Sequence, residues 1–150
     1  MSRVDRRILG RSGLQVSRIA LAGSFGISAD DTVRGFEELG VSTFFVTSRS
    51  SGQLEGIRRL CAAGHRDALT LIAVASIPMG FSVKRELASI SKLLGVDAVD
   101  LFLLGWVQYH WYVTGKTWPA MRALKEEGRV RALGISCHDR PLARALIDVK

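Results

Sequence analysis

The run Leu69-Thr70-Leu71-Ile72-Ala73-Val74-Ala75 is apolar at nearly every position. A strand with one solvated face alternates apolar and polar residues, whereas a parallel strand covered on both faces is almost continuously apolar. Leu101-Phe102-Leu103-Leu104 repeats the same pattern farther along the chain. These two runs therefore predict parallel strands in the interior of an α/β fold.

Outward from these runs, the chain alternates helix, glycine and strand. A glycine follows four of the predicted helices and precedes a strand, as the left-handed residue that ends a helix does; these are Gly40, Gly64, Gly95 and Gly128. The predicted strands cover residues 17–23, 41–47, 69–75, 98–104 and 130–136. The predicted helices cover residues 29–39, 52–63, 82–94 with Ser82 as its cap, 117–128 with Thr117 as its cap, and 141–150. This order predicts a parallel α/β architecture with about five β/α units.

A β-hairpin is predicted before the first of these units. Residues 7–9 and 14–16 read as short strands, and Gly10-Arg11-Ser12-Gly13 between them reads as the turn. We therefore expect one domain over residues 1–150, with the hairpin at 1–17 and the β/α units at 18–150.

The composition is that of a globular protein, with 47% hydrophobic and 23% charged residues. Without a signal-type segment or a run of ~18 apolar residues, we expect a cytoplasmic protein with no membrane partner. The net charge of +7 comes from basic residues scattered along the chain, so we expect no nucleic-acid partner. Cys61 and Cys137 are expected to be reduced and structural, and no metal site is predicted.

Several segments resemble aldo-keto reductases in the order in which that family has them. Residues 9–17, LGRSGLQVS, are similar to the family's opening hairpin, which plugs the bottom of a (β/α)8 TIM barrel. Residues 40–45 and 99–104 resemble its second and fourth strands, and residues 124–136, LKEEGRVRALGIS, are the most specific match. A barrel of this type needs ~250 residues. The resemblance therefore implies a partial barrel, with its C-terminal half absent from a fragment of 150 residues.

The resemblance also implies carbonyl reduction with a hydride from NADPH or NADH. Family members use Asp, Tyr, Lys and His at the carboxyl ends of barrel strands to supply a proton to the developing alkoxide. The matching positions here hold Val46, Ser51, Ala75 (within one residue) and Gly105. None of these side chains can perform that chemistry, so we expect a pseudoenzyme.

Tyr109 and His110, in the loop after the fourth barrel strand, are the candidate substitutes for acid-base work. The interpretation that we favour is that these side chains pack over the barrel rim.

The positions that match the family's nicotinamide contacts are Gly23 and Ser24 after the first barrel strand and Ser136 and Cys137 after the fifth. Ser136 agrees with the family pattern, whereas Cys137 stands where the family has an asparagine amide. With the adenine and phosphate subsites in the absent half, the resemblance implies weak binding of NADP or NAD, or none.

Three hypotheses remain open. The chain is an inactive, truncated aldo-keto reductase; or it is a non-catalytic half-barrel that pairs with itself or with a complementary half; or a full-length form is an active NAD(P)-dependent oxidoreductase with non-standard catalytic residues.

Overall fold

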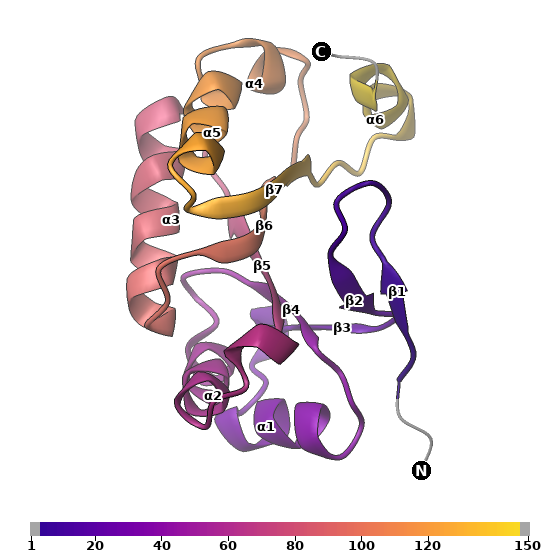
Figure 1. Ribbon diagram of the computed structural model, residues 1–150. Coiled ribbons are helices and arrows are strands. Elements are labelled where there is room, and N and C mark those ends of the chain that lie inside the picture. Colours follow the sequence, from indigo (N-terminus) through magenta and orange to yellow (C-terminus); the bar gives the residue numbers. More distant parts are fainter. Residues whose placement is uncertain (1–3, 148–150) are drawn as a thin grey trace.

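The computed structural model describes residues 4–147, which form a parallel sheet, a hairpin and helices (Figure 1). Residues 1–3 of the predicted hairpin unit and residues 148–150 of the predicted last helix lie outside the described residues. The strands are β1 (Arg6–Ile8), β2 (Gln15–Ser17), β3 (Ala20–Ala22), β4 (Thr43–Val46), β5 (Thr70–Ala75), β6 (Val99–Leu104) and β7 (Val130–Ile135). The α-helices are α1 (Ala29–Glu37), α2 (Ser51–Ala62), α3 (Gly80–Leu94), α4 (Trp111–Thr114), α5 (Thr117–Glu126) and α6 (Arg140–Ile147), and the 3-10 helices are η1 (Gly23–Phe25) and η2 (Arg66–Ala68).

The sheet has five parallel strands in the order β3-β4-β5-β6-β7, so each strand lies beside the next one in the sequence. A crossover that contains a helix joins each strand to its neighbour. Helices α1, α2, α3 and α5 lie on one side of the sheet and the β1-β2 hairpin lies on the other (Figure 1). Among the described residues, β3 and β7 each have one neighbouring strand and form the two edges. This is the predicted fold, a partial (β/α)8 barrel preceded by a hairpin.

The core lies between the sheet and its helices, and we call it the helix-side core. Phe44, Leu71 and Phe102 point into it from three neighbouring strands and are fully buried. Ile57 of α2 and Leu87 of α3 meet them from the helices. Because burying such a side chain contributes about 1.5–3 kcal/mol, this layer is the main source of the fold's stability.

The other face of the sheet, which we call the inner face, carries the alternate residues of each strand. Side chains along a strand point to opposite faces in turn. Phe45, Ile72, Leu103 and Ala132 lie outside the helix-side core and are only partly buried. The inner face is therefore apolar and partly open in the described part of the chain.

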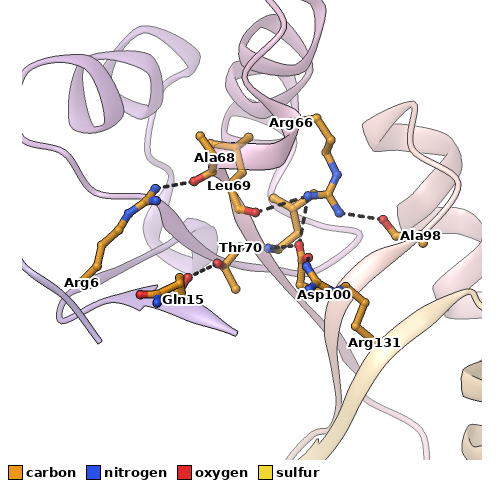
Figure 2. Close-up of polar contacts among 10 residues, drawn as sticks. Arg6, Gln15, Arg66, Ala68, Leu69, Thr70, Ala98, Asp100 and Arg131 are labelled. Carbon is orange, nitrogen blue, oxygen red and sulfur yellow. Dashed lines mark hydrogen bonds and ion pairs between the residues drawn. The ribbon is translucent and has the colours of Figure 1, made fainter. Parts of the chain in front are cut away.

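The hairpin is held across the beginnings of the central strands. The Thr70 hydroxyl donates to the Gln15 carbonyl at 2.6 Å, and the Arg6 guanidinium donates to the Ala68 carbonyl (Figure 2). The hairpin thus covers the amino-terminal ends of the strands and leaves their carboxyl ends open. The family resemblance implied the same place for the hairpin, at the bottom of the barrel.

Two predicted helix caps are wrong, and for Thr117 a contact from elsewhere in the fold explains the difference. Helix α3 begins at Gly80 with Met79 as its cap residue, so Ser82 lies inside its first turn. Helix α5 has Lys116 at the cap position, while the Thr117 hydroxyl donates to the carbonyl of Pro78 at 2.6 Å. That bond joins α5 to the loop before α3. Sequence spacing alone cannot reveal such a partner.

The longest helix within residues 4–147 is α3, with 15 residues. None of the helices in that range combines the length and the apolarity that crossing a bilayer requires.

Candidate functional site

Because the strands are parallel, the segments that follow their carboxyl ends gather at one end of the molecule, which we call the mouth. These segments are residues 23–28, 47–50, 76–79, 105–110 and 136–139. All the residues to which the sequence assigned chemistry or cofactor contacts lie in these segments or directly beside them. The mouth is therefore the candidate functional site.

Val46 and Ala75 end their strands, but their side chains do not point into the barrel. Both are fully buried and belong to the helix-side core. The inner-face residues beside them are Phe45 and Val74, which lie outside that core. The family's aspartate and lysine can be matched to Val46 and Ala75 or, one residue earlier, to Phe45 and Val74. In both cases the side chains at these positions are apolar.

Gly105 follows β6 and is buried against β5. Its N–H donates to the Ala75 carbonyl at 2.7 Å. A Cβ at this position would lie 2.6 Å from Val74 Cγ1 and 3.1 Å from the Ala75 oxygen. The space that an imidazole would need is filled by β5, so no histidine fits here unless Val74 moves.

Ser51 is the first residue of α2 and is exposed. Its neighbour Ser50 is buried, and the Ser50 and Thr47 hydroxyl oxygens lie 3.1 Å apart in a hydrogen bond. Neither serine carries an aromatic ring. The mouth therefore holds no phenol at the position that matches the family's tyrosine.

Tyr109 and His110 lie at the mouth within an aromatic cluster. The rings of Tyr109 and Trp111 stack with their centroids 6.4 Å apart, and Tyr112 meets both rings edge-on. Both Tyr109 and His110 are exposed. These ring contacts join residues of the same loop to one another.

The four predicted cofactor positions lie at the mouth, after β3 and after β7. Gly23 is buried, whereas Ser24 is exposed. The Ser136 carbonyl accepts from Val107 N–H at 2.8 Å, and the Cys137 thiol donates to the Asp139 carbonyl at 3.3 Å. Cys137 therefore offers a thiol, and no amide, at the position that matches the family's asparagine.

Gly23 instead has a packing role. A Cβ there would lie 2.5 Å from Ser50 Cβ and 2.7 Å from Gln53 Oε1. We expect Gly23→Ala to lower the free energy of unfolding by about 1–3 kcal/mol, measured by urea denaturation. Ser24→Ala, at the exposed next residue, should change that free energy by less than about 0.5 kcal/mol. Equal stability of the two variants would show that Gly23 is not packed in this way.

A buried charge cluster lies at the opposite end of the sheet from the mouth. Asp100 on β6 is 3% exposed, and its two carboxylate oxygens pair with Arg66 and Arg131, each at 3.1 Å (Figure 2). Leu71 N–H donates to the same carboxylate at 2.9 Å. The sequence contained one signal for this cluster, because Asp100 is a single carboxylate within an apolar strand. A buried carboxylate needs charged or hydrogen-bonding partners. Because both oxygens are paired, this cluster is structural.

Of the two cysteines, Cys137 lies at the mouth, whereas Cys61 lies on α2 outside it. Burial raises the pKa of the Cys61 thiol, against the opposing charge of Arg66. The thiol is therefore protonated at neutral pH and a poor nucleophile. Among residues 4–147, no group of three or more His, Cys, Asp or Glu side chains is arranged to hold a metal ion.

Comparisons with known proteins found similarity between this chain and one family. The model of the aldo/keto reductase family matches residues 80–145. L-galactose dehydrogenase from Arabidopsis thaliana is 26% identical over an alignment that covers 91% of this chain and 49% of that protein.

Solved structures show the same fold. An aldo-keto reductase from Bacillus halodurans superimposes with a TM-score of 0.80 and 20% identity, over 97% of this chain and 54% of its own. The Bombyx mori aldo-keto reductase in complex with NADP gives a TM-score of 0.70 and 20% identity, over 90% and 51%. This chain therefore spans about half the length of these relatives.

Proposed function

We propose that this chain is a member of the aldo-keto reductase superfamily without carbonyl reductase activity of its own. The observation that carries the proposal is the content of the mouth. In either register of β4 and β5, apolar side chains stand where the family has its aspartate and lysine. A carbonyl oxygen at the strand ends would meet no phenol at the position that matches the family's tyrosine, and no aspartate or lysine beside that position.

Residues at the mouth also support the proposal that this chain binds the cofactor weakly. Relatives of this fold include a structure in complex with NADP. In this chain Cys137 stands in place of the family's amide and its thiol is turned to Asp139. Gly23 is packed against Ser50 and Gln53 rather than open to a ligand. We propose that NADPH and NADH bind weakly or not at all.

An assay of the purified chain tests both parts. We expect no oxidation of NADPH, followed by absorbance, above the rate without protein when aldehydes and ketones of several sizes are supplied. We also expect no saturable quenching of protein fluorescence by NADPH at micromolar concentrations.

An active aldo-keto reductase of known structure, assayed in parallel, is the control for the substrates and the cofactor. Carbonyl-dependent NADPH oxidation by this chain that Tyr109→Phe abolishes would overturn the proposal and would make Tyr109 the proton donor. Micromolar affinity for NADPH would overturn the part on cofactor binding.

A second role is favoured by the sheet edges. Within residues 4–147, β3 and β7 each leave one row of backbone groups unpaired, and the inner face between them is apolar and partly open. Unpaired edges promote association with another chain. We propose that a second copy or a complementary half-barrel pairs there.

Self-association has a direct test. We expect light scattering after size exclusion to give twice the mass of the chain, 16.4 kDa. Ala132→Lys on β7 should return the protein to the monomer, because it places a charge on the inner face beside the edge. Arg122→Gln, on the exposed side of α5, is the matched control and should leave the mass unchanged. A monomer at all concentrations would exclude pairing between copies.

A further inference from the structure

An exposed apolar surface lies beside the mouth, where the loop before α3, the short helix α4 and the start of α5 meet. We call it the rim face, and its large exposed side chains are Ile77, Met79, Phe81, Tyr109 and Trp111. We infer that the rim face docks on a membrane surface that contains anionic lipids. The expectation of no membrane partner rested on the lack of a spanning segment, which docking at the surface does not require.

Two contacts hold the parts of the rim face together. The Thr117 hydroxyl, at the start of α5, donates to the Pro78 carbonyl at 2.6 Å. Gly80, the first residue of α3, packs against the turn between α4 and α5, because a Cβ there would lie 3.2 Å from the Lys116 oxygen. Helix α4 ends directly before this turn and lies at the same end of the molecule (Figure 1). The exposed side chains of the two segments therefore form one surface.

The side chains of the rim face are of the kind that enter the interfacial layer of a bilayer. Phe81 and Trp111 are 66% and 57% exposed. The rings of Tyr109 and Trp111 stack on each other, yet both residues remain exposed. Tryptophan and tyrosine are enriched at the level of the lipid headgroups, and apolar side chains beside them bury into the boundary of the acyl chains. A cluster of exposed large apolar side chains is typical of a surface with a partner.

The charge of the rim face is complementary to an anionic surface. The two stretches of chain that build it, residues 68–85 and 101–125, contain no aspartate or glutamate. Arg85 lies one turn after Phe81 on the same face of α3, and Lys116 lies in the turn beside α4. Both cations are exposed, and neither has an ion-pair partner among residues 4–147. They are therefore available to lipid phosphates.

Glu86, which follows Arg85, is the carboxylate closest to these stretches in the sequence. It accepts from Ser76 N–H at 3.1 Å and forms no ion pair within the described part of the chain. A second copy docked through the same face would bring like charges together, which disfavours a dimer there. An anionic bilayer offers phosphates to the cations and acyl chains to the rings at the same time.

Co-sedimentation of the full chain with lipid vesicles tests the inference. We compare vesicles of phosphatidylglycerol mixed with phosphatidylcholine and vesicles of phosphatidylcholine alone. We expect saturable binding to the mixed vesicles, at least about tenfold weaker binding to phosphatidylcholine alone, and a blue shift of tryptophan emission on binding. Phe81→Ser and Trp111→Ser should each weaken binding about fivefold or more, and Lys116→Gln about threefold or more.

Two control variants separate the rim face from the rest of the surface. Leu93→Ser removes an exposed apolar side chain at the other end of α3. Arg11→Gln removes an exposed, unpaired cation in the turn of the hairpin, and so measures the general attraction of a chain with a net charge of +7. Each control should change binding less than about twofold.

Circular dichroism shows whether each variant is folded before it is mixed with vesicles. No binding to the mixed vesicles would overturn the inference, and so would equal weakening by Trp111→Ser and Leu93→Ser or by Lys116→Gln and Arg11→Gln. Equal binding to both kinds of vesicle would overturn the assignment to anionic lipids. A mass that Trp111→Ser lowers without vesicles would identify the rim face as a contact between copies instead. The mixture contains no NADPH and no carbonyl compound, so its outcome is independent of the proposed lack of reductase activity.

Discussion

Replacing Asp100 by alanine is expected to lower the free energy of unfolding by about 2–4 kcal/mol. The variant leaves the Leu71 N–H buried without an acceptor and removes the partner of Arg66, whose side chain is 29% exposed. Arg131 contributes less to this loss, because its side chain is 66% exposed and solvent screens its charge. Urea denaturation followed by circular dichroism measures the change.

Two further variants separate the charge from the hydrogen bond. Asp100→Asn keeps an acceptor for Leu71 N–H, so we expect it to lose less stability than Asp100→Ala. Asp97→Ala, at an exposed position three residues away, is the control and should stay within about 0.5 kcal/mol of the parent. If Asp100→Ala is as stable as this control, the cluster does not hold the strands together.

Placing an aspartate at Val46, where the family has one, is expected to destabilise the fold by about 4 kcal/mol rather than to restore a catalytic group. The Val46 side chain lies in the helix-side core, where it is 0% exposed to solvent. A carboxylate there is buried without a partner. Phe45→Asp places the same group on the inner face, where the side chain is only partly buried, and should cost about 2 kcal/mol.

Chemical denaturation of the two variants decides the register of β4. A loss for Phe45→Asp that equals or exceeds the loss for Val46→Asp would mean that Phe45 points into the helix-side core. The assignment of the inner face would then be reversed. Ser51→Tyr changes an exposed residue at the start of α2, so we expect little change in the free energy of unfolding. This variant is the control substitution at the mouth.

Most of the sheet could be predicted because its signals are local. The apolar runs in β5 and β6 require burial on both faces, and the glycines at 95 and 128 end the preceding helices with a positive φ of 70° and 73°. The short helix α4 was not predicted, because its four residues lie in an aromatic loop whose shape depends on ring contacts.

The candidate site was predictable in its content but not in its geometry. The absence of Asp, Tyr, Lys and His at the matching positions is a fact of the sequence. A shift of one residue moves a side chain to the opposite face of a strand. The resemblance matched Val46 to the family's aspartate, and only the structure shows that Val46 lies in the helix-side core and that Phe45 lies outside it.

The sequence by itself determined the order of strands and helices and the residues available at the mouth, because apolar periodicity and glycine stops act over a few neighbouring residues. Only the tertiary structure decided which side chains point inward, that Asp100 is paired with two arginines, and that Ser82 lies inside the first turn of α3 instead of capping it. Each of these depends on segments tens of residues apart coming into contact. The packing of the whole sheet against its helices brings them together, and no local pattern encodes it.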